Sequence, residues 1–163
     1  MIRLLFVCLG NICRSPTAQA VAERQLREKG WDKLVFADSA GSHAYHVGEP
    51  PDRRTQFAAR KRGMDMSPQR ARRVTRADLD EFDYVIAMDE NNLADLHELA
   101  GGTHEHKVFL MMGFAPDAGV REVPDPYYGG SDGFETVIDL LERAVAGLLQ
   151  HIEHRHPELQ AGD

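Results

Sequence analysis

Five residues separate the thiol of Cys8 from the guanidinium of Arg14 near the start of the chain. A thiolate is a strong nucleophile, and a guanidinium presents paired N–H donors that match two oxygens of a phosphate. Between them, Gly10 and Asn11 readily adopt a positive φ, which would turn backbone N–H groups toward an anion. Ser15 adds a hydroxyl that can donate to the thiolate. This spacing predicts attack of sulfur on phosphorus, with a phosphocysteine intermediate.

The flanking segments place this loop between a strand and a helix. The apolar run at residues 4–7 is typical of a buried strand, and Ser15 and Pro16 suit the N-cap and first residue of a helix. Such a helix directs unpaired N–H groups at the loop and favours an anion there. The alternative is a structural cysteine beside a surface arginine. The loop lacks the Gly-Lys-Ser/Thr of a nucleotide-binding P-loop.

Composition is typical of one globular domain. The chain has 163 residues, of which 42% are hydrophobic and 28% charged. We find no signal peptide and no apolar run near the ~18 residues of a membrane span, so we expect a cytoplasmic protein without a membrane partner. Only two cysteines occur, Cys8 and Cys13, which form no disulfide framework. The expected domain covers residues 1–157, with a flexible C-terminal tail at 158–163.

The charge is unevenly distributed. A net charge of −7 argues against nucleic acid as a partner. Nine of the nineteen basic residues nevertheless lie within residues 53–76, where Asp65 is the only acid. This run is either a solvated helical surface or a basic patch that steers a doubly charged phosphoester.

Short apolar segments alternate with helical patterns along the chain. We expect strands at residues 3–7, 34–39, 84–88 and 107–112, and helices at 16–29, 52–62, 90–100 and 133–153. This order predicts an α/β fold, a single three-layer domain with a four-stranded parallel sheet and helices on both faces. Ligands of such sheets bind beyond the carboxyl ends of the strands, where Cys8, Ser39 and Asp89 would meet.

Two motifs together resemble one family. Residues 8–16, Cys-Leu-Gly-Asn-Ile-Cys-Arg-Ser-Pro, resemble the phosphate-binding loop of the low-molecular-weight protein tyrosine phosphatases, and residues 125–128, Asp-Pro-Tyr-Tyr, resemble their general-acid segment. Residues 38–41, 47–48 and 82–89 follow in the family's order. The resemblance implies hydrolysis of phosphotyrosine in proteins, and of small aryl phosphates, without metal or cofactor. Inorganic phosphate and other oxyanions would compete, and the protein would be a monomer or a weak homodimer.

The resemblance also implies a role for each site residue. Cys8 is the nucleophile, Arg14 the phosphate clamp, and Asp125 the general acid and then the base. Without the resemblance, Asp125 between two prolines would be interpreted as a turn residue. The remaining loop residues are Leu9, Gly10, Asn11, Ile12, Cys13 and Ser15; Asn11 and Ser39 support the loop, and Tyr45, Tyr127 and Tyr128 line the substrate pocket.

Three positions leave alternatives open. Gln69 stands at or near the place of a family histidine, and its amide could bond to Asn11. Asp89 is expected to add a hydrogen bond near the rim. Cys13 is either a small buried residue or, as the resemblance implies, a redox partner that forms a reversible disulfide with Cys8. The histidines at 104, 106, 151, 154 and 156 are interpreted as exposed residues and not as metal ligands.

Competing functions differ at specific residues. Protein arginine phosphatases carry Thr where this chain has Ile12, and they lack the tyrosine pair at 127 and 128. Arsenate reductases of similar fold need further cysteines, and none follows Cys13. A catalytically silent phosphotyrosine-binding module is the alternative from another class. Retention of Cys8, Arg14 and Asp125 favours the enzyme.

Overall fold

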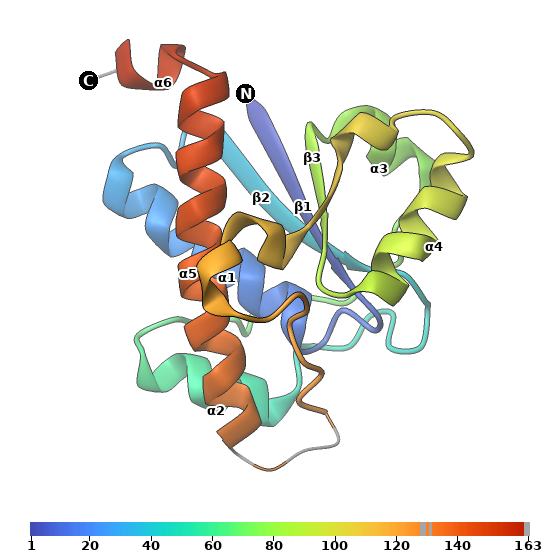
Figure 1. Cartoon of the computed structure of the whole chain (residues 1–163). Helices are drawn as coiled ribbons and strands as arrows, with labels where there is room; N and C mark the ends of the chain where they lie inside the picture. The colour runs from blue at the N-terminus through green and yellow to red at the C-terminus, as the bar shows by residue number, and fades with distance from the viewer. Residues whose placement is uncertain (128–129, 131, 162–163) are drawn as a thin grey trace.

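Four parallel strands form the centre of the molecule, in the order β2-β1-β3-β4 (Figure 1). The strands are β1 (Ile2–Cys8), β2 (Val35–Gly41), β3 (Tyr84–Ala87) and β4 (Val108–Leu110). The computed structural model describes residues 1–127, 130 and 132–161. Because β1 pairs on both edges, its side chains are buried almost throughout. The predicted α/β fold with a four-stranded parallel sheet is confirmed.

Helices cover both faces of this sheet and divide the core in two (Figure 1). On one face, Leu4 and Phe6 of β1 pack with α1 (Arg14–Lys29) and α5 (Asp132–Arg155). On the other face, Leu5 and Val7 pack with α3 (Arg76–Glu81) and α4 (Glu90–Ala100). Alternate residues of a strand point to opposite faces, so one apolar run supplies both cores.

Further short elements lie in the connections between the strands and the long helices. Helix α2 (Arg53–Lys61) lies beside the N-terminal end of α5 (Figure 1). The 3-10 turns η1 (Glu105–Lys107), η2 (Met111–Phe114) and η3 (Pro116–Ala118) lie around and after β4. Asp52 caps α2 by accepting from the backbone N–H groups of Arg54 and Thr55. Helix α3 was not predicted, although Thr75 and Asp78 form a capping box at its start.

Helix α5 packs closely against the 3-10 turn η2. Helix α5 buries the apolar stripe that identified it, and Gly147 allows contact with η2, because a Cβ there would collide with the carbonyl of Phe114. Residues Glu158–Ala161 form helix α6, and Leu159 is only 2% exposed. The predicted flexible tail is therefore wrong for Leu159, which is in the core; residues 162 and 163 lie outside the described residues. The domain extent of 1–157 stays a prediction.

In the described part of the chain, no helix combines the length and the apolar character that crossing a membrane requires.

Candidate active site

The loop between β1 and α1 surrounds the thiol of Cys8, which is only 3% exposed. Its Sγ lies 3.0 Å from the Oγ of Ser15. Ser15 was predicted as the N-cap of α1, but the helix begins at Arg14, and Cys13 takes the cap position without a side-chain hydrogen bond. The prediction failed because the Ser15 hydroxyl is used beneath the loop instead. No side chain therefore caps the N-terminus of α1, which leaves its N–H groups for an anion.

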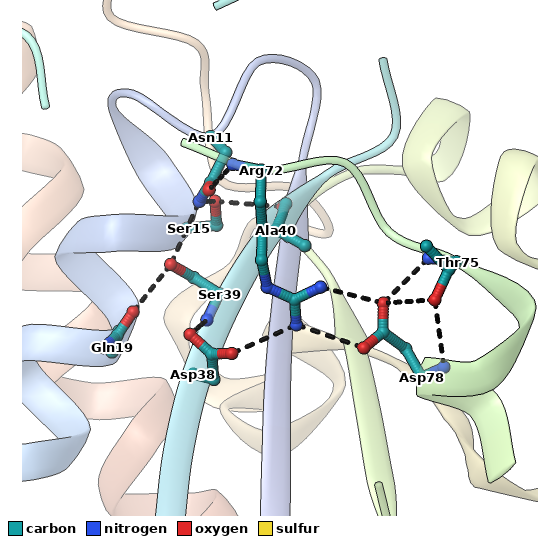
Figure 2. A network of polar contacts seen from close by, with 9 residues as sticks. All are labelled: Asn11, Ser15, Gln19, Asp38, Ser39, Ala40, Arg72, Thr75 and Asp78. Carbon is teal, nitrogen blue, oxygen red and sulfur yellow. Dashed lines mark hydrogen bonds and ion pairs between the residues drawn. The ribbon is translucent and has the colours of Figure 1, made fainter. Parts of the chain in front are cut away.

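Asn11 has the positive φ that the sequence predicts, 58°, and its side chain holds the loop from below. Its Nδ2 donates to Ser15 Oγ at 2.8 Å and to Ser39 Oγ at 3.0 Å. Ser39 in turn donates to Gln19 Oε1 at 2.7 Å (Figure 2). The structure thus places Asn11 and Ser39 in direct contact, 28 residues apart in the chain. A residue other than glycine rarely adopts a positive φ, and these hydrogen bonds hold Asn11 in that conformation.

The side-chain oxygen of Asn11 accepts a hydrogen bond from Arg72 and not from Gln69. Oδ1 of Asn11 accepts from the backbone N–H of Arg72 at 3.1 Å. The proposed contact with Gln69 is wrong, because the Gln69 amide donates to the carbonyl of Pro16 at 3.1 Å. Sequence reasoning missed Arg72 in this position.

The side chain of Arg72 fixes the backbone that holds Asn11. Its guanidinium reaches Asp38 at 3.0 Å and both oxygens of Asp78 at 3.0 and 3.1 Å (Figure 2). Asp78 is buried and also accepts from the N–H of Thr75. Burial opposes the charge of Arg72, but these two carboxylates hold its pKa above the usual value. The network connects the loop to β2 and to the start of α3.

Arg14 lies beneath the loop, only 3% exposed. One guanidinium nitrogen, Nη1, donates to Asp89 Oδ2 at 2.7 Å and to the carbonyl of Val123 at 3.1 Å. The other, Nη2, lies 3.8 Å from Asp125 Oδ2. Burial opposes the charge of Arg14, yet Cys8, Asp89 and Asp125 together raise its pKa. Asp89 is therefore more closely involved than expected, because it orients the guanidinium as well as capping α4.

Asp125 faces the loop from a turn. Its Oδ1 accepts from the backbone N–H of Tyr127 at 3.0 Å, which is the pattern of an Asx turn. About a third of its side chain is exposed. Both interpretations of this residue therefore agree with the geometry: it forms a turn, and the turn directs the carboxylate toward Arg14.

A cavity of about 120 Å³ opens over the thiol. Its lining brings together most of the predicted site residues: Cys8, Leu9, Gly10, Ile12, Cys13, Arg14, Tyr45, His46, Asp125 and Tyr127. Tyr128 lies outside the described residues. Tyr45 is 68% exposed and its ring stacks on His43, with 5.3 Å between centroids.

His46 is a pocket residue that sequence reasoning missed. Its ring lies 6.3 Å from the ring of Tyr127, and its Nδ1 lies 2.7 Å from a carboxylate oxygen of Glu49. Gly10 allows this approach, because a Cβ there would lie 2.9 Å from the imidazole. Its position directly after Tyr45, a predicted pocket residue, was the one feature of the sequence that indicated it.

Cys13 is buried at the end of the loop, and both cysteines are free. Burial, chiefly, raises the pKa of its thiol to about 12, with smaller contributions from the charges of Asp52 and Cys8. Cys13 is therefore protonated and packs as a small apolar residue near neutral pH.

The histidines predicted to be exposed fall in two places. His104 and His106 are on the surface near η1, and His104 pairs with Asp80 at 2.6 Å. His151 instead packs among the rings of Tyr84, Phe109 and Phe114, and Tyr84 Oη lies 3.0 Å from Nε2 of His156. Exposure was thus a wrong prediction for His151, whose Nε2 is buried without a partner among the described residues.

Comparison with known proteins agrees with this geometry. Residues 3–158 match the family described as low molecular weight phosphotyrosine protein phosphatase. YfkJ of Bacillus subtilis, a low molecular weight protein-tyrosine-phosphatase, is 41% identical over 94% of this chain and 97% of its own. The human low molecular weight phosphotyrosine protein phosphatase is 38% identical over 90% of this chain and 93% of its own.

A solved structure has the same fold. The protein tyrosine phosphatase of Entamoeba histolytica, crystallised with Hepes in the active site, superposes with a TM-score of 0.92. It is 40% identical, over 94% of this chain and 98% of its own. The chain belongs to the low molecular weight phosphotyrosine protein phosphatase family.

Proposed function

We propose that this chain hydrolyses phosphotyrosine in proteins, and small aryl phosphates, through a phosphocysteine intermediate. The supporting observation is the convergence of Cys8, Arg14 and Asp125 on one pocket with two tyrosines in its lining. The names and the shared fold of its relatives also support this activity.

In the first step, the Cys8 thiolate attacks phosphorus and the bond from phosphorus to the tyrosine oxygen breaks. Protonated Asp125 gives its proton to that oxygen, so the leaving group departs as a neutral phenol. Arg14 and the N–H groups at the start of α1 stabilise the negative oxygens of the phosphoryl group. Asp89 and the carbonyl of Val123 hold the guanidinium in position for this.

In the second step, water attacks the phosphocysteine, and the Asp125 carboxylate takes its proton. The sulfur–phosphorus bond breaks, which releases inorganic phosphate and the Cys8 thiolate. The Ser15 hydroxyl, 3.0 Å from Sγ, can donate to that thiolate. Inorganic phosphate and other oxyanions are thereby expected to compete for the pocket. No cofactor takes part in the proposed cycle, because Arg14 and the N–H groups supply the positive charge.

The pocket walls favour an aryl substrate. Tyr45, His46 and Tyr127 present rings around the space above the thiol, which suits stacking with the phenyl ring of phosphotyrosine. Tyr128 belongs to the same proposal by sequence. We further propose a cytoplasmic protein that acts as a monomer or weak homodimer.

The test is phosphate release from phosphotyrosyl, phosphoseryl and phosphoarginyl peptides of one sequence, at mildly acid pH with reductant and EDTA. We expect turnover of the phosphotyrosyl peptide alone, and none with Cys8→Ser. Asp125→Asn should lower kcat by about 10²- to 10⁴-fold, the usual contribution of a general acid. Preference for phosphoarginine would mean that Ile12 and the tyrosines do not set specificity. No turnover with any peptide would favour the binding module.

A further inference from the structure

A second and larger cavity, of about 630 Å³, runs along the outer surface of α2 beside the start of α5. Ala58 and Phe134, both nearly fully buried, form an apolar floor. Phe57 stands over it with 58% of its surface exposed, which is unusual for a phenylalanine. We call this cavity the α2 groove.

The α2 groove is lined by cations, and within the described part of the chain two of these side chains form no ion pair. Lys61 pairs with Glu135 at 2.7 Å, and Arg54 pairs with Asp52 at 3.1 Å. The guanidinium groups of Arg53 and Arg60, in contrast, form no hydrogen bond or ion pair with any residue that the structure describes, although the charge of Arg60 contributes to lowering the pKa of Asp65. Positions 53, 57 and 60 share one helical face, so two unpaired guanidinium groups flank the exposed ring.

Arg54 joins this groove to the active site. Its Nη2 donates to the carbonyl of Tyr127 at 3.1 Å, and its guanidinium lies 5.4 Å from the centre of the Tyr127 ring. The same guanidinium lies 4.9 Å from the ring of Phe134 in the groove floor. Tyr127 therefore has the active-site cavity on one side and Arg54 on the other. A peptide whose phosphotyrosine fills the cavity would leave it next to the groove.

We propose that the α2 groove binds an acidic segment of the same phosphoprotein whose phosphotyrosine occupies the active site. This inference rests on the proposed function. The carboxylates would pair with Arg53 and Arg60, and an apolar side chain would pack on Phe57. With a net charge of −7, most of the molecule repels an acidic peptide, so this positive surface is selective. Helix α2 has nine residues and is about 14 Å long, which about four extended residues span.

The experiment compares two phosphotyrosyl peptides that differ only in their flanking residues, which are Glu and Asp in one peptide and Gln and Asn in the other. The flanking residues are placed first on the N-terminal and then on the C-terminal side of the phosphotyrosine. The double variant Arg53→Ala with Arg60→Ala is tested against wild type. A control, Arg27→Ala with Lys33→Ala, removes the same charge from the last turn of α1 and the turn that follows it. We expect kcat/KM for the acidic peptide to fall about fivefold in the groove variant, as two partly exposed ion pairs predict. The control, the neutral peptide and p-nitrophenyl phosphate should be unaffected.

Phe57→Ala provides a second variant that keeps the charge. It should weaken turnover of acidic peptides with an apolar residue in the flanking segment, and of no others. Equal losses for both peptides, equal losses in the control, or no wild-type preference for the acidic peptide would each overturn the proposal.

A binding measurement separates this proposal from the proposed function. Anisotropy of the labelled peptides with Cys8→Ser, with and without the two groove substitutions, measures the groove without turnover. If wild type hydrolyses no phosphotyrosine but the acidic peptide still binds through Arg53 and Arg60, the activity is wrong and the groove is right. If p-nitrophenyl phosphate is hydrolysed normally and binding is insensitive to flanking charge, the groove is wrong and the activity stands.

Discussion

The hydroxyl of Ser15 lies between the proposed nucleophile and the residue that shapes the loop. It is 3.0 Å from Cys8 Sγ and accepts from Asn11 at 2.8 Å. Asn11 supplies a donor to this oxygen, so the Ser15 proton has two acceptors within reach, the sulfur of Cys8 at 3.0 Å and the carbonyl of Ala40 at 3.4 Å. We expect the shorter contact, to sulfur, to take the proton when Cys8 is a thiolate. The hydroxyl is thereby oriented to favour the thiolate.

Ser15→Ala should therefore lower kcat by roughly 10- to 100-fold, the worth of a hydrogen bond to a charged group. Steady-state kinetics with p-nitrophenyl phosphate measures this loss. Ser42→Ala is the matched control, because Ser42 is also buried, directly after β2, but its hydroxyl contacts His43 instead of sulfur. An unchanged kcat in Ser15→Ala would show that the contact does not stabilise the thiolate.

The raised pKa of Cys13 makes a prediction about oxidation. Peroxide converts a thiolate to a sulfenic acid, and a second thiolate then displaces hydroxide from it to form the disulfide. Cys13 is protonated near neutral pH because burial raises its pKa to about 12. If Cys13 is the redox partner of Cys8, disulfide closure should accelerate by about tenfold per pH unit between pH 6 and 9.

Mass spectrometry of alkylated samples, taken over time after one equivalent of peroxide, measures that closure. Cys13→Ser should form no disulfide, and with excess peroxide its Cys8 should be oxidised past the sulfenic acid to the sulfinic acid, which a dithiol does not reduce. A closure rate independent of pH would contradict the prediction, and absence of a Cys8–Cys13 peptide would leave Cys13 with its packing role alone.

Among the elements, the segment before α3 matters most for the loop. The Arg72 backbone binds Asn11, while the Arg72 side chain is held by Asp38 and Asp78 (Figure 2). Arg72→Met keeps the aliphatic stem but leaves buried Asp78 without its cation. We expect about 1–3 kcal/mol lower unfolding free energy and a lower kcat with little change in KM.

Urea unfolding and steady-state kinetics test both parts of this prediction. Arg70→Met is the control, since Arg70 is exposed and donates only to the carbonyls of Ser67 and Gln69. Arg72→Lys should recover part of the kcat, which a purely local loss of stability would not require. If Arg72→Met unfolds more easily but keeps full kcat, its role is confined to stability.

The sequence predicted a residue's role correctly where that residue type has few other roles in proteins. Cys8, Gly10, Asn11 and Arg14 belong to a single short loop, so local geometry fixes their relation. The strands and long helices followed from periodicity because burial imposes it. Ser15 was misassigned as a cap, since a serine before Pro16 suits either use and only tertiary contacts decide between them.

Contacts between distant segments were the least predictable. Arg72 reaches Asn11 through its backbone N–H, a group that every residue except proline carries, so its side chain gave no sign of this bond. His46 enters the pocket through the course of an irregular loop, which periodicity does not describe. The arginine-rich run was ambiguous for a similar reason. Arg62 and Arg72 proved to be bridges to acids elsewhere, whereas Arg53 and Arg60 did not.

At the scale of the whole molecule, the packing of α5 against the sheet makes stability depend on pH. His151 lies among three aromatic rings, and burial, followed by the charges of Arg155, His154 and His156, lowers its pKa below 6.5. At a pH between the pKa of His151 in the folded protein and 6.5, its pKa in the unfolded chain, the unfolded chain therefore binds more protons than the folded one. Stability is therefore complete above pH 6.5 and decreases as the pH falls through the folded pKa.

His151→Phe should remove this part of the pH dependence while keeping an aromatic side chain. Thermal unfolding between pH 4.5 and 8 measures it, and His106→Ala, a change at an exposed histidine, should leave the profile as in wild type. If the unfolding temperature of His151→Phe falls with decreasing pH as steeply as that of wild type, other groups cause the pH dependence of stability.

The two halves of the active site differ in how firmly the fold holds them. Cys8 and Arg14 belong to the central strand and its following helix, whereas Tyr45, His46 and Tyr127 stand on irregular segments. Asp125 is held through the backbone N–H of Tyr127, a contact that survives replacement of the tyrosine side chain. Substrate preference can therefore diverge between descendants of one ancestor by changes in these segments alone, while the bond-breaking step is inherited unchanged. Directed evolution toward a new phosphoester should begin with residues 43–49 and 127.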